Sequence, residues 1–183
     1  ERLAAEGVVV APVWNKSNRE HTIIGSEPSG TREAADKAVE ALGWKNEYLL
    51  DADHINLTTS SPLEGATFID LTDLYSKRLR DLAKTVDSTL DEGVYVQFRG
   101  PHYETPAEVQ MAKIMGGHIV GMSTALEAIA AREAGMEILG MSLITNLAAG
   151  IQTTPLSHAE VLEAGRNAEA RIGKLLAEIV AKL

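Results

Sequence analysis

Short apolar runs alternate with amphipathic runs along most of this chain, and this order constrains the fold more than any other feature. Apolar runs predict strands at 7–14, 46–57, 94–98, 118–123 and 136–145, with a short extended segment at 66–71. Helical spacing of apolar residues predicts helices at 29–43, 72–86, 104–116, 124–135 and 158–183. Strands that alternate with helices form sheets covered on both faces. We therefore predict a single α/β domain over 1–183, with three α/β/α layers around a mostly parallel, mixed sheet.

Composition narrows the class of partner. The 183 residues are 45% apolar, which is enough for one domain with a hydrophobic core. The formal net charge of −9 argues against nucleic acids and anionic membranes as partners. A small anionic ligand would need its own pocket of donors, because the overall field repels it.

The cellular setting follows from what the sequence lacks. There is no cysteine, so disulfides and thiolate chemistry are excluded and a reducing compartment is expected. No apolar run approaches the length of a membrane span, and the opening ERLAAEG has no signal-peptide pattern. We expect a cytoplasmic protein.

Residues of unusual kinds gather toward the ends of the predicted strands. They are Asp51, Asp53 and His54 within the second strand, 102–104 after the third, then Met122 with Ser123, and Thr145 with Asn146. In open α/β sheets, ligands bind in the crevice beyond the carboxyl ends of the strands. The four strand ends together therefore predict a binding site for a small molecule.

Four motifs resemble the trimeric purine nucleoside phosphorylases, in the same order: GPHYETPAE, VGMSTALEAIAAREAG, LGMSLITNLAAG and LSHAEVLEAG. The upstream SPLEGATFIDLTDLYS is similar too, so the resemblance covers about 53–183. It implies phosphorolysis of purine nucleosides to base and ribose 1-phosphate, with inorganic phosphate as co-substrate and no cofactor or metal. The family is trimeric, but the oligomeric state of this chain stays open.

The resemblance also implies a role for seven residues. Glu104 would hold the six-membered ring of a 6-oxopurine, and Asn146 would hydrogen-bond at N7, so these two are the catalytic candidates. The others would bind substrate or phosphate: Tyr103 on the base face, Thr145 beside Asn146, Met122 under the ribose, His158 near the 5′-hydroxyl and Ser123 on phosphate.

Each of these residues also has a purely structural interpretation. Glu104 precedes Thr105-Pro106 and would complement the positive end of a helix. Ser123 is a good N-cap for a helix from Thr124, although a capping serine can also bind an anion. The remaining alternatives are a core methionine at Met122, a loop asparagine at Asn146 and an ordinary first-turn residue at His158.

The first part of the chain departs from the family. A Gly-Ser-Gly phosphate loop, an Arg-x-His-x-Tyr-Glu-Gly segment and an Asn-Ala-Ala-Gly turn are not found, and of the phosphate contacts only Ser123 remains. Residues 1–52 resemble instead a βαβ segment of a TIM-barrel sugar-acid epimerase of the tagaturonate type, with a seam at 53–57. On this interpretation the protein is an engineered chimera that keeps the purine and ribose half of the site without efficient catalysis.

Other interpretations stay open, including whether the chain is an enzyme at all. It would be an active phosphorylase if GSEPSGTR at 25–32 replaced the phosphate loop, or a non-catalytic binding or assembly module. A plain helix-start loop is favoured at 25–32, because the P-loop lysine and the G-x-G-x-x-G pattern are both missing. A metal site is disfavoured, because alternation places Asp51 and Asp53 on one face of a strand and His54 on the other.

Overall fold

The computed structural model describes residues 46–65, 68–152 and 155–183. Its elements are β1 (Tyr48–Asn56), α2 (Lys77–Val86), β2 (Asp91–Gln97), α3 (Pro106–Ile114), β3 (Ile119–Gly121), α4 (Ala125–Glu133), β4 (Gly140–Leu143) and α5 (His158–Val180). The strand predicted at 7–14, the helix at 29–43, the loop at 25–32 and the barrel-like assignment of 1–52 lie almost entirely outside the described residues.

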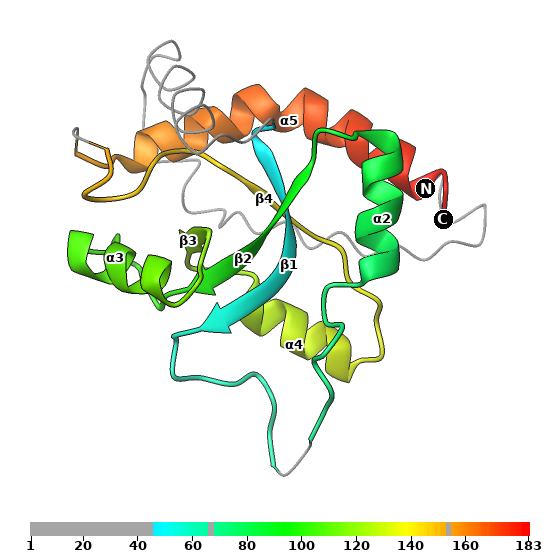
Figure 1. The fold of residues 1–183 in the computed structure, drawn as a ribbon, viewed down its shortest axis with the longest axis horizontal. Coiled ribbons are helices and arrows are strands. Elements are labelled where there is room, and N and C mark those ends of the chain that lie inside the picture. Colours follow the sequence, from blue (N-terminus) through cyan, green and yellow to red (C-terminus); the bar gives the residue numbers. More distant parts are fainter. Residues whose placement is uncertain (1–45, 66–67, 153–154) are drawn as a thin grey trace.

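The four strands form one mixed sheet in the order β3-β2-β1-β4 (Figure 1). β1 pairs parallel with β2, and β2 pairs parallel with β3. β4 runs antiparallel to β1, with Leu143 opposite Tyr48 and Gly140 opposite Asp51. The predicted α/β fold with a mostly parallel, mixed sheet is confirmed.

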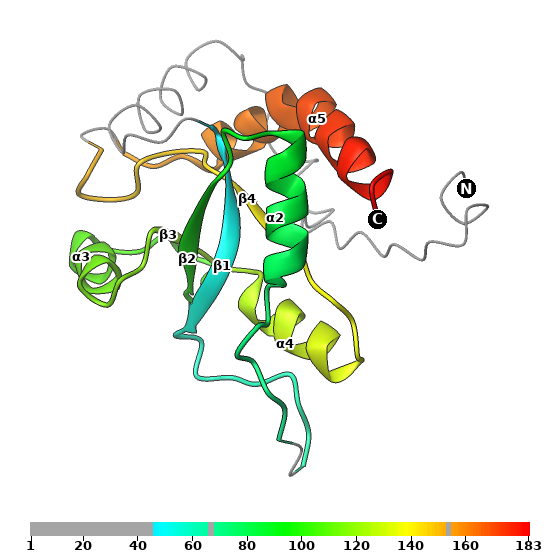
Figure 2. The same cartoon turned by 45° about the vertical axis from the view of Figure 1, so that its right-hand side comes forward.

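Alternation along β1 divides the core between the two faces of the sheet. Tyr48 and Leu50 are fully buried against α2 and α5, where they meet Ala83, Leu175 and other apolar side chains. Leu49 points to the opposite face and packs with Ile144. Figure 2 shows α2 to one side of the sheet and α3 to the other. The helices thus cover the strands from both sides.

The helix predicted to start at Thr72 starts later. Its N-cap is Ser76, whose hydroxyl accepts a hydrogen bond from the Leu79 amide at 3.3 Å. The Thr72 amide and hydroxyl bond instead to the Asp70 carboxylate, at 3.0 and 2.7 Å, in a local turn. The described part of the extended segment predicted at 66–71 is not a strand. Because the Thr72 hydroxyl is bonded to Asp70, Thr72 does not cap the helix.

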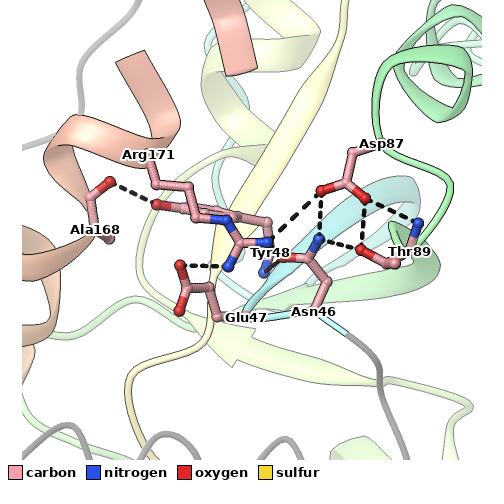
Figure 3. A network of polar contacts seen from close by, with 7 residues as sticks. All are labelled: Asn46, Glu47, Tyr48, Asp87, Thr89, Ala168 and Arg171. Atoms are coloured by element: carbon pink, nitrogen blue, oxygen red, sulfur yellow. Dashed lines mark hydrogen bonds and ion pairs between the residues drawn. The ribbon is translucent and has the colours of Figure 1, made fainter. Parts of the chain in front are cut away.

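A polar network fastens α5 to the beginning of β1 (Figure 3). The Arg171 guanidinium donates to Glu47 at 2.9 Å and to the Asn46 side-chain oxygen at 3.0 Å, and it lies 5.6 Å from the ring centre of Tyr48. Asn46 in turn donates to Asp87 at 2.9 Å. Arg171 therefore joins a long helix to a strand and to the turn after α2.

Replacing Arg171 by alanine should lower the free energy of unfolding by about 1 kcal/mol, because several contacts of one cation act together. Chemical denaturation measures the loss. The matched control is Lys174→Ala on the same helix, which breaks an exposed ion pair with Glu178, and its effect should stay below about 0.5 kcal/mol. Equal effects of the two substitutions would contradict the role of the network.

Candidate functional site

Glu104 lies just before α3 but does not cap it. Thr105 is the N-cap, and its hydroxyl accepts from the Glu108 amide at 3.3 Å while the Glu108 carboxylate accepts from the Thr105 amide at 2.7 Å. This reciprocal capping box satisfies the start of the helix. The hydrogen bonds at the start of α3 are therefore satisfied without Glu104, whose structural interpretation was to complement the positive end of the helix by its charge.

The Glu104 carboxyl group is buried with an unused hydrogen-bonding oxygen. The residue is 8% exposed, and among the described residues its Oε1 atom has no hydrogen-bond partner. Burial raises the pKa of Glu104, and the negative charge of Glu108 raises it further. Leaving a carboxylate oxygen buried without a partner costs free energy. The site is therefore suited to a ligand that donates a hydrogen bond there.

A close contact brings the loop after β2 against the loop after β3. Gly100 has a φ of +61°, and a Cβ atom at this position would lie 2.4 Å from the Met122 sulfur. Only glycine permits this approach. Met122 thus lies directly against Gly100, in the GPHYE segment that also contains the partly buried Tyr103.

Thr145 and Asn146 lie in a tight turn after β4. The Asn146 side-chain oxygen accepts from the Ala148 amide at 3.0 Å, and its nitrogen donates to the Thr145 hydroxyl at 3.0 Å. A second contact joins this loop to α3, since a Cβ atom on Gly150 would lie 2.6 Å from Pro106 Cβ. The loop lies on the α3 side of the molecule in both views (Figure 1, Figure 2).

The prediction that four carboxyl ends meet at one edge of the sheet is wrong for β4. Because β4 is antiparallel, its carboxyl end lies beside Tyr48, at the amino end of β1. The loop that follows Asn146 reaches the start of α3 through Gly150.

Ser123 is held by neighbouring hydroxyl groups. Its Oγ atom lies 3.4 Å from the Tyr95 hydroxyl and 3.2 Å from Thr124 Oγ1. The N-cap residue of α4 is Thr124, and no side-chain capping bond forms there. The interpretation of Ser123 as a helix cap is therefore wrong, and its hydroxyl is engaged on the side of β2.

One residue at this place was missed by sequence reasoning. Gln97 is 4% exposed, and its side chain accepts from the Leu126 amide at 3.1 Å and donates to the Met122 carbonyl at 3.4 Å. The sequence does contain a signal that could have identified Gln97, because a polar amide side chain stands inside the apolar run VYVQF and would need hydrogen-bond partners when buried.

His158 is the first residue of α5, as the first-turn interpretation expected, and Ser157 is the N-cap. It is partly buried. Its position in the helix is therefore confirmed, whereas contact with a ribose stays a prediction.

The three candidate metal ligands on β1 do not form a cluster. A β-bulge shifts the register between Asp51 and Asp53, so the expected alternation fails. Asp51 is buried and accepts from the Ser142 hydroxyl at 2.9 Å, whereas Asp53 is exposed. His54 Nδ1 lies 3.0 Å from the Tyr75 hydroxyl. Within the described ranges, no group of three or more histidine, aspartate or glutamate side chains is placed to hold a metal ion.

None of the helices in the described part of the chain combines the length and the apolar character needed to cross a bilayer.

Comparison with known proteins identifies a family. The family described as "Phosphorylase superfamily" matches residues 47–181. A purine nucleoside phosphorylase of Cellulomonas sp is 62% identical over 162 residues, covering 82% of this chain and 57% of the relative. The crystal structure of a Schistosoma purine nucleoside phosphorylase with hypoxanthine superposes with a TM-score of 0.72 at 32% identity, covering 77% of this chain and 57% of that one. A Schistosoma mansoni purine nucleoside phosphorylase with inosine gives 0.70 at 32% identity, covering 75% and 55%.

These matches correct the interpretation of the first segment. The family match starts at residue 47, before the expected seam at 53–57. The 82% covered by the Cellulomonas relative is about 150 of 183 residues, more than 53–183 contains, so similarity extends into 1–52. The matches give no support to a barrel-derived segment or an engineered chimera. The chain spans little more than half the length of these relatives.

Proposed function

The chain belongs to the phosphorylase superfamily, and we propose that its described residues form the purine and ribose side of a purine nucleoside phosphorylase site. The reaction class is the transfer of a ribosyl group from a purine base to inorganic phosphate. Inorganic phosphate is the nucleophile, and purine nucleoside phosphorylases need no cofactor.

This proposal rests on the buried Glu104 oxygen, which has no hydrogen-bond partner among the residues that the structure describes. A 6-oxopurine has a donor at N1–H, and guanine adds the amine at C2. Both donors can point at one carboxylate, which would satisfy the oxygen that burial leaves without a partner. The structure of a Schistosoma relative contains hypoxanthine, a base with this donor.

Asn146 has the donor that a departing base requires. Its amide nitrogen has two hydrogens, and the contact with Thr145 uses one of them. The second can be donated to N7 of the purine, where negative charge accumulates as the glycosidic bond breaks. A donor held in place before the reaction stabilises that charge most in the transition state.

The remaining assignments complete the site. Met122 would lie under the ribose and Tyr103 on the base, which suits the contact of Met122 with Gly100 in the loop that contains Tyr103. Ser123 would bind phosphate and His158 the 5′-hydroxyl group. Of the family's phosphate contacts only Ser123 is identified in this sequence, so we expect this chain to bind purines more effectively than it cleaves nucleosides.

Calorimetric titration with hypoxanthine and cytosine tests the proposal. Hypoxanthine should bind in preference to cytosine, and Asn146→Ala should weaken hypoxanthine binding roughly 10-fold, the effect of one hydrogen bond to a polar ligand. Asn56→Ala is the matched control, because Asn56 also holds a local turn, through Thr58 and Ser60. Equal binding of the two bases, or equal effects of the two substitutions, would contradict the assignment.

A further inference from the structure

Two side chains of β2, Tyr95 and Gln97, hold the loop 122–124 between β3 and α4. We propose that they are positioning residues, which fix Met122 and Ser123 for a ribose and its phosphate. The inference rests on the proposed function, because it takes the ribose and phosphate side of the site to be loop 122–124. Neither residue is among the substrate contacts that the motifs imply.

Tyr95 orients the Ser123 hydroxyl. Its ring is 6% exposed, and its hydroxyl oxygen lies 3.3 Å from the Ser123 amide nitrogen, which donates to it. The same oxygen lies 3.4 Å from Ser123 Oγ. Having accepted the amide proton, the tyrosine can donate its own proton to Ser123 Oγ. The serine proton then points away from Tyr95, where an anion can compete for it with Thr124 Oγ1 at 3.2 Å.

The approach of Tyr95 depends on a glycine. A Cβ atom on Gly121 would lie 2.1 Å from the Tyr95 hydroxyl oxygen and 2.9 Å from the ring carbon that bears it. Any side chain at position 121 would therefore displace the tyrosine ring. The glycine at the end of β3 allows the hydroxyl to pass beneath the strand and reach Ser123.

Gln97 holds the same loop from both sides. It lies two residues after Tyr95, on the same face of β2. Its side chain bonds the Met122 carbonyl before the turn and the Leu126 amide after it. Between these contacts, Thr124 has a φ of +85°, a left-handed conformation that is costly for a β-branched residue. Such a conformation persists only where its surroundings determine it, and the two bonds of Gln97 do so.

Tyr95→Phe tests the inference, because it removes only the hydroxyl group. Calorimetry should show ribose 1-phosphate binding weakened roughly 10-fold, the effect of losing a hydrogen bond, and hypoxanthine binding changed less than about 2-fold. In a Ser123→Ala background, Tyr95→Phe should add no further loss, since the residue acts through Ser123. Tyr48→Phe, which removes a buried tyrosine hydroxyl that donates to the Ala168 carbonyl, should change neither affinity. An equal loss for both ligands, or no loss for either, would overturn the inference.

Amide hydrogen exchange separates this inference from the proposed function. Tyr95→Phe should speed exchange at Ser123, and Gln97→Leu should speed it at Leu126, with the Val96 amide as internal reference. If the wild-type protein binds neither ligand, the proposed function fails and exchange alone decides whether these residues hold the loop. Unchanged exchange at both amides would refute the positioning role whatever the protein binds.

Discussion

Replacing Glu104 by glutamine should weaken guanine binding about 100-fold, and hypoxanthine binding only about 10-fold. On the proposed function, guanine presents two donors, N1–H and the C2 amine, to the two carboxylate oxygens. Glutamine offers one acceptor and turns a donor toward the second donor of the base. Hypoxanthine has only N1–H on this side, so one acceptor still serves it. Isothermal calorimetry with both bases measures the difference.

The neighbouring carboxylate gives a matched control. Glu108 is partly exposed, and its carboxylate accepts from the Thr105 amide in the capping box, so Glu108→Gln keeps the acceptor that the helix needs. Its guanine and hypoxanthine affinities should stay within about 2-fold of the original protein, as for a surface residue away from the ligand. A Glu104→Gln variant that binds both bases as the original does, or loses both equally, would remove Glu104 from the base-recognition role.

Periodicity was sufficient to locate the elements that build the core. The short length and the valine and aromatic content of apolar runs such as VYVQF favour buried strands, and β2 and β1 lie where they were predicted. Apolar residues at helical spacing over 158–183 likewise predicted the long helix α5. Burial of apolar side chains determines these elements locally, so the sequence pattern contains the necessary information.

Strand direction and local polar competition could not be predicted in the same way. The run that forms β4 has the same apolar character whether it pairs parallel or antiparallel, and only its pairing with β1 decides where Asn146 lies. Asp70 and Ser76 decide the start of α2, and the bulge at Ala52 separates Asp51 from Asp53. Gln97 becomes a candidate only when its two loop partners are known. These features depend on contacts between distant residues.

Asp51 should make the protein less stable as pH rises from 4 to 8. The residue is 1% exposed, and burial raises the pKa of its carboxyl group from 3.8 to about 7, although the Ser142 hydroxyl donates to it. Folding therefore favours the protonated form. The stabilisation is complete below pH 3.8 and is lost as pH rises through about 7. The difference between these pKa values corresponds to about 4 kcal/mol.

Asp51→Asn should remove this pH dependence, because asparagine has the shape of the protonated carboxyl group but does not ionise. Urea denaturation at pH 4 and pH 8 measures the change. The free energy of unfolding at pH 8 should rise by roughly 2–4 kcal/mol relative to the original protein, with little gain at pH 4. Other carboxylates, including Asp87 and Glu137, have lowered pKa values, so their contribution to stability increases as pH rises. The difference between Asp51→Asn and the original protein therefore isolates the effect of Asp51. Asp53→Asn, two residues along the same strand but exposed, should leave the profile unchanged. Parallel profiles for Asp51→Asn and the original protein would mean that Asp51 is charged within the folded sheet, with a partner strong enough to offset its burial.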